Sequence, residues 1–223
     1  MEGDVLIALE IDDESAESGK RTFMCPKSQL CDASAYFDRA LNGEFKEASE
    51  GCLQLPGASV ESVKLLLYYI TQDEMPPIAR EIAREVAKES GTTQEAFKER
   101  IVEYHKMLAE VWMLGEQVMM PEMQNEAMRE ILELMKQSST PAAAVAHGFE
   151  LGSTLKLGHV YAVEARYQYL QERTMSHSDI AQLAKVDGLI EAIFDEVRKI
   201  LKGAKLKFKS ANHECWDFNV DED

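Results

Sequence analysis

Segments with strand character are confined to the first quarter of this 223-residue chain. Two short apolar runs, DVLIALEI at 4–11 and RTFMC at 21–25, flank a polar, turn-like segment and predict a β-hairpin. Pro26 ends the second run, because proline has no N–H to donate to a strand ladder. A third short run, CLQL, follows at 52–55. We therefore expect a small sheet of about three strands, the first of them buried on both faces because its alternation is weak.

Helical periodicity dominates the rest of the chain. One helix is expected over 27–41, where Leu30, Ser34, Phe37 and Leu41 recur at helical spacing and form a single inward face. Ser59 stands in front of an apolar run and is the expected cap of the next helix. Further helices are predicted at about 78–90, 93–119, 122–137, 141–149, 155–173, 178–185 and 187–202.

The charge balance limits the classes of partner. The formal net charge of −16 repels phosphate backbones and anionic lipid surfaces, so we expect neither nucleic acid nor a membrane as a partner. The sequence shows no secretory signal and no run of about 18 apolar residues, which predicts an intracellular protein, cytoplasmic or nuclear. Four cysteines without paired spacing (Cys25, Cys31, Cys52 and Cys215) are expected to be reduced thiols.

No pattern of catalytic or metal-binding residues is found. None of the known nucleophile, phosphate-loop or zinc motifs occurs, and no two of the five histidines have the spacing of a zinc site on one helix. We therefore expect no catalytic residue, no cofactor and no metal, and each histidine is expected at the surface or at a helix cap. His213 and Cys215 are two residues apart and could together ligate a metal ion, but the sequence shows no second pair of this kind. Met119, Met120, Met123 and Met128 indicate either core filling or an adaptable binding groove.

Four segments carry a resemblance to a known family. They read LCDASAYFDRAL at 30–41, GEFKEASEGCLQLPG at 43–57, SVKLLLYYI at 62–70 and HKMLAEVWMLGEQVMMPEMQNEAM at 105–128. Together and in this order they resemble the BTB (POZ) domain family, and most closely its fungal members. The sequence departs from the family at Pro26–Lys27, where members usually have His-Lys.

The resemblance implies an α+β, mainly helical chain with a BTB/POZ-like fold, in which a small sheet of about three strands is flanked by helices. Residues 1–137 would form this domain, with a helical insertion at about 72–102. Residues 138–210 would form a C-terminal helical extension, and residues 211–223 an acidic tail.

The resemblance also implies a non-enzymatic protein–protein interaction module that acts as an adaptor or scaffold for other proteins. Self-association stays open, and its expected surface is Val5, Leu6, Ile7, Leu30, Ala33 and Tyr36. Some family members act as substrate adaptors of cullin-based ubiquitin ligases through a hydrophobic-x-Glu motif, which Phe45-Lys46-Glu47 matches in place. The alternative is that Phe45 packs against its own domain.

Two other functions remain open from the sequence. The helices over 141–202 could form a small-molecule-binding or enzymatic domain, with Tyr161, Tyr167 and Tyr169 lining a pocket, although packing of these tyrosines between helices is the simpler interpretation. The acidic surface could instead serve transcriptional control, acting only through partners because no DNA-binding motif is found.

Overall fold

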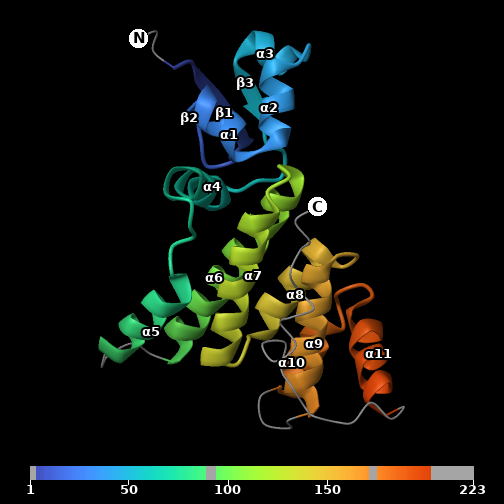
Figure 1. Cartoon of the computed structure of the whole chain (residues 1–223). Helices are drawn as coiled ribbons and strands as arrows, with labels where there is room; N and C mark the ends of the chain where they lie inside the picture. The colour runs from blue at the N-terminus through green and yellow to red at the C-terminus, as the bar shows by residue number, and fades with distance from the viewer. Residues whose placement is uncertain (1–3, 89–93, 171–174, 202–223) are drawn as a thin grey trace. The chain divides into compact units, whose positions relative to one another are not determined.

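The computed structural model describes residues 4–88, 94–170 and 175–201 of the chain (Figure 1). Among these residues the chain forms two compact units. The first unit holds residues 4–75 and 110–126, and the second holds residues 76–109 and 127–201. The boundary falls within α6 (Gln94–Gln117) and α7 (Pro121–Gln137). The prediction of a mainly helical α+β chain with a small three-stranded sheet is confirmed.

The sheet of the first unit has the strand order β2-β1-β3. It consists of β1 (Leu6–Asp12), β2 (Lys20–Pro26) and β3 (Cys52–Gln54). The predicted hairpin is confirmed, since β1 and β2 pair in antiparallel register, whereas β3 pairs with β1 in parallel.

Burial alternates along β1, so the prediction of a strand buried on both faces is wrong. Ile7, Leu9 and Ile11 are buried, while Leu6 on the opposite face is 55% exposed. The outer face carries the apolar residues Leu6 and Ala8, which conceal the alternation in the sequence.

The single helix predicted over 27–41 is wrong, because the backbone breaks at Ser34. That residue has an extended conformation (φ −154°, ψ 132°) and separates α1 (Lys27–Ala33) from α2 (Ala35–Asn42). Its hydroxyl accepts a hydrogen bond from the Tyr36 N–H at 3.0 Å and donates one to the Val118 carbonyl. The inward face still forms, since Ser34 is buried together with Leu30, Phe37 and Leu41.

Ser34→Ala is expected to lower the free energy of unfolding by about 2 kcal/mol. The substitution removes the cap of α2 and leaves the buried Val118 carbonyl without its hydroxyl donor. Urea denaturation measures the loss, and Ser49→Ala is the matched control because the Ser49 hydroxyl is exposed and bonds only the Lys46 carbonyl of its own helix. Equal losses in the two variants would contradict the role given to Ser34.

Two more helices complete the N-terminal part of this unit, α3 (Lys46–Glu50) and α4 (Val60–Gln72). The predicted cap at Ser59 is confirmed, since its side chain and that of Ser62 form a reciprocal capping box. The Ser59 hydroxyl also donates to Oε2 of Glu110 at 2.6 Å, which ties the start of α4 to α6.

The second unit is entirely helical in its described part. It contains α5 (Ile78–Lys88), α8 (Ala142–Gly152), α9 (Lys156–Leu170), α10 (His177–Leu183) and α11 (Leu189–Leu201), with the adjoining parts of α6 and α7. The described part of the predicted insertion at 72–102 corresponds to the end of α4, α5 and the first turns of α6. Residues 89–93 of this insertion and the predicted acidic tail lie outside the described residues.

Helices α8 and α9 form a hairpin with very close backbone packing (Figure 1). A Cβ added to Gly158 would lie 2.3 Å from the Gly152 carbonyl oxygen, and one added to Gly148 would lie 2.1 Å from Cε2 of Tyr161. These positions therefore accept only glycine without a shift of the packed groups. At the other face of α9, Arg166 pairs with the largely buried Glu196 of α11 at 3.7 Å.

His105 is fully buried in the second unit, so the prediction that every histidine lies at the surface or at a cap is wrong. Its Nδ1 lies 3.1 Å from the Tyr161 hydroxyl, and its Nε2 has no hydrogen-bond partner among the residues the structure describes. Burial lowers the pKa of His105 from 6.5 to about 3, and it raises the pKa of Tyr161.

Candidate functional site

Phe45 presents an apolar ring at the surface of the first unit. It is the residue before α3, has an extended backbone (φ −84°, ψ 159°) and is 60% exposed. Its ring lies over Gly43, where an added Cβ would come within 2.9 Å of the Phe45 Cδ2. Phe45 is therefore not buried in its own domain, although part of its ring lies against Gly43.

A pocket of about 240 Å³ lies beside this ring. Its other lining residues come from α2, α3, β3 and the turn between α6 and α7, and they are Tyr36, Arg39, Ala40, Glu47, Leu53 and Met119. The Phe45 pocket thus combines an apolar wall with one cationic and one anionic side chain. Such a composition suits a partner's apolar side chain that is flanked by polar groups.

The charged residues next to Phe45 have different surroundings. Lys46 is exposed and its Nζ lies 3.9 Å from Oε2 of Glu50, which is also exposed, so that ion pair adds little stability. Glu47 is half-buried in the first turn of α3. Burial raises the pKa of Tyr36, and the negative charge of Glu47 raises it further, so both groups belong to one local electrostatic environment.

Met119 is a lining residue that the sequence analysis did not single out from its methionine cluster. It has a left-handed backbone (φ 55°) and is 52% exposed, whereas Met120, Met123 and Met128 are buried. Core filling is therefore the role of those three. The left-handed conformation is uncommon for a residue with a long side chain, and no sequence motif indicates it.

The six residues predicted for self-association divide into two groups. Val5 is 61% and Leu6 55% exposed, and Ala33 and Tyr36 are half-buried. Ile7 and Leu30 are buried in the core of their own chain, so their side chains offer no surface to a second copy. Met24, which the prediction omitted, lies on the same sheet face as Leu6 and is 54% exposed.

The three tyrosines that could have lined a pocket in the helical part do not meet at one site. Tyr161 is buried against His105 and Tyr167 is half-buried. Tyr169 is 43% exposed and lines an apolar pocket of about 250 Å³ together with residues of α10 and α11.

The described residues contain no group of three or more His, Cys, Asp or Glu side chains that could hold a metal ion. His213 and Cys215 lie outside the described residues. The described cysteines are free thiols, as expected, with Cys25 buried and Cys31 and Cys52 partly exposed. Over residues 4–88, 94–170 and 175–201, no helix is both long and apolar enough to cross a membrane.

Comparison of the sequence with models of known protein families gives no match, and comparison with curated proteins gives none either.

Proposed function

We propose that this chain is a non-enzymatic protein–protein interaction module of the BTB/POZ type, which binds partner proteins through the surface around Phe45. The observation that carries the proposal is the exposure of the Phe45 ring at the edge of the Phe45 pocket, next to the carboxylate of Glu47. An aromatic side chain held in this way is the kind of anchor on which protein interfaces depend.

The order of elements supports the assignment to the BTB/POZ type. The first unit begins with two strands, three short helices, a third strand and a helix, and the resemblance implies strand, strand, helix, strand and helix. The segment that resembles the first helix of the family contains the buried Leu30, Phe37 and Leu41. The helix break at Ser34 occurs inside this segment and preserves its inward face.

Phe45→Ala is expected to weaken binding of a partner protein about 30-fold. Removing a central aromatic anchor costs roughly 2 kcal/mol or more, and 1.4 kcal/mol corresponds to a tenfold change. The immobilised full chain is exposed to cell extract, and the amounts of bound proteins are compared by mass spectrometry between the wild type and the variant. Phe194→Ala is the matched control, since Phe194 is 50% exposed and belongs to the second unit.

Proteins captured equally by the wild type and by Phe45→Ala would show that the Phe45 surface is not the binding site. If Phe194→Ala lost the same proteins, the loss would not be specific to the Phe45 surface, and this too would contradict the proposal. Both variants are expected to fold, because exposed side chains contribute little to stability. Far-UV circular dichroism checks this.

A role as a substrate adaptor of a cullin-based ubiquitin ligase is the second candidate, and the arrangement of Phe45-Lys46-Glu47 favours it. The hydrophobic residue is exposed and the glutamate stands two residues later in the first turn of α3. Phe45 would fill an apolar pocket of the cullin and Glu47 would orient the complex by hydrogen bonding. Titration of a purified cullin N-terminal domain onto the same variants tests this role: saturable binding that Phe45→Ala abolishes supports it, and no binding excludes it for that cullin.

Self-association belongs to the proposal as a further property. The exposed apolar side chains of Val5, Leu6 and Met24 at the hairpin would supply the contact between two copies. Burying them would stabilise the contact, since apolar area removed from water is worth about 25 cal/mol per Å².

A further inference from the structure

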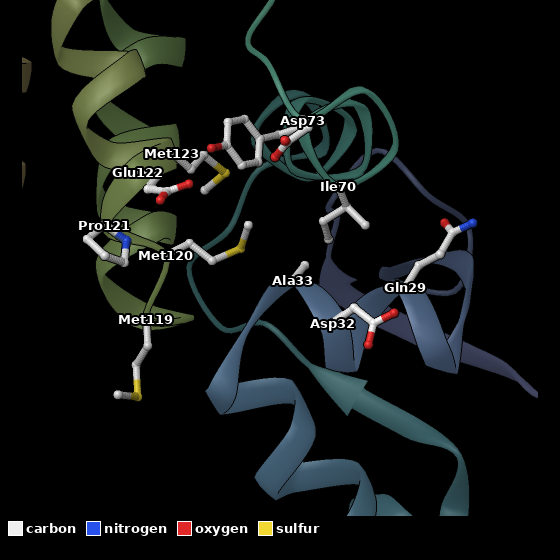
Figure 2. A pocket seen from close by; sticks show the side chains of 11 residues that line it. Gln29, Asp32, Ala33, Ile70, Asp73, Met119, Met120, Pro121, Glu122 and Met123 are labelled. Carbon is white, nitrogen blue, oxygen red and sulfur yellow. The ribbon is translucent and has the colours of Figure 1, made fainter. Parts of the chain in front are cut away.

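The first unit contains a second and larger pocket, of about 600 Å³ (Figure 2). It is lined by α1, the end of α4, the turn between α6 and α7, and the first turn of α7. Among the described lining residues, the two pockets have Met119 alone in common. A pocket of this volume is large enough for two or three amino-acid side chains of a bound peptide.

Apolar side chains form the inner wall of this larger pocket. Met119 is 52% exposed, and Ala33 and Ile70 line the pocket from α1 and α4 with half-buried side chains, whereas Met120 and Met123 line it as buried side chains (Figure 2). Methionine side chains are flexible and polarisable, so they adapt to apolar groups of different shape.

Three carboxylates from three different elements surround the same pocket. Asp32 comes from α1, Asp73 ends α4 and Glu122 lies in the first turn of α7 (Figure 2). None of the three forms an ion pair in the part of the chain that the structure describes, and the lining contains no lysine, arginine or histidine. Three exposed carboxylates therefore stand around one opening, and the described part of its lining holds no cationic side chain to balance them.

We propose that this pocket binds a peptide segment of a partner protein in which arginine or lysine alternates with apolar residues. The apolar side chains would pack on Met119, Ala33 and Ile70, while the cationic groups would pair with the surrounding carboxylates. All three carboxylates are exposed, so each ion pair would contribute modestly and the preference for a basic peptide would come from several pairs together. The exposed apolar wall would thus supply affinity, and the carboxylates would select a basic partner.

The probe for the test is the peptide acetyl-Leu-Arg-Leu-Arg-Leu-amide, titrated into the full chain with methyl-labelled methionine. Saturable shifts of the Met119 and Met120 methyl resonances are expected. The uncharged peptide acetyl-Leu-Gln-Leu-Gln-Leu-amide is expected to bind at least tenfold more weakly, because it forms no ion pairs.

Asp73→Asn is the variant that tests the carboxylates. Asp73 has a left-handed backbone (φ 57°), which asparagine also tolerates, so the fold is retained. Binding of the arginine peptide is expected to weaken about threefold to fivefold. Glu14→Gln is the matched control, since it removes the same charge from an exposed position in the hairpin turn, and it is expected to leave the affinity unchanged.

Equal weakening by Asp73→Asn and Glu14→Gln would overturn the proposal, because it would show attraction to the net charge of the chain. Equal binding of the two peptides, or methyl resonances that do not shift, would overturn it as well. Phe45→Ala is expected to leave the arginine-peptide affinity unchanged. A failure here is therefore distinguishable from a failure of the Phe45 surface as a docking site.

Discussion

Gly148→Ala is expected to lower the free energy of unfolding of the second unit by at least about 3 kcal/mol. The added Cβ would lie 2.1, 2.4 and 2.5 Å from three atoms of the Tyr161 ring, far inside van der Waals contact. The ring cannot move aside easily, because Tyr161 is fully buried and its hydroxyl is held by His105 at 3.1 Å. Overpacking of a core costs 1–3 kcal/mol or more, and the overlap here is severe.

The direction of this effect is opposite to that of helix propensity. In an exposed helix, alanine in place of glycine stabilises by about 1 kcal/mol, so a measured loss reports the clash alone. Urea denaturation gives the stability, and hydrogen exchange of the α8 and α9 amides locates the change. Ala143→Gly in the same helix is the control for propensity, with an expected loss of about 1 kcal/mol.

A double-mutant cycle sharpens the test. Tyr161→Ala removes the ring that the new Cβ would meet, so adding Gly148→Ala to Tyr161→Ala is expected to cost little. If the two substitutions were additive, the proposed contact between Gly148 and Tyr161 would not be the cause of the instability.

Local chemistry explains which parts of the fold the sequence predicts. The hairpin follows from two apolar runs around a polar turn and from Pro26, and the cap of α4 follows from Ser59 and Ser62, which act on their immediate neighbours. The sequence does not predict the break at Ser34, because the inward position of this residue fits one continuous helix as well as it fits two helices separated there. The hydrogen bond from Ser34 to the Val118 carbonyl favours the broken helix, and its two partners are 84 residues apart in the sequence.

The two candidate binding surfaces also differ in how far they depend on local sequence. Phe45-Lys46-Glu47 is contiguous and was predicted as a motif, although its exposure depends on how Gly43 and α3 fold around it. The larger pocket brings Asp32, Asp73 and Glu122 together from three elements, and nothing local marks them. Their convergence is a property of the tertiary structure. The sequence alone does not distinguish these three carboxylates from the others, because the chain has 40 acidic residues.

The burial of His105 was within reach of the sequence. It follows Ile101 by four residues and precedes Leu108 by three, so it belongs to the apolar stripe of α6. All three of these side chains are buried in the structure. Burial removes water from the charged form of the histidine and so lowers its pKa. The stability of the folded chain therefore depends on pH.

Acidification from about pH 7 to about pH 5 is expected to remove about 2 kcal/mol of stability through His105 alone. The unfolded chain binds a proton there near pH 6.5, whereas the folded chain does so only near pH 3. The unfolded state therefore carries more protons between these values, so the stabilising contribution is complete above pH 6.5 and is lost as the pH falls. Urea denaturation at the two pH values measures the loss.

His105→Gln isolates this contribution, because glutamine can still hydrogen-bond the Tyr161 hydroxyl but does not titrate. The variant is expected to lose about 2 kcal/mol less than the wild type over the same pH interval. His177→Gln is the matched control, since His177 is exposed at the start of α10, and it is expected to keep the wild-type dependence. A His105→Gln variant as acid-sensitive as the wild type would mean that other groups, and not the buried imidazole, make the second unit sensitive to acid.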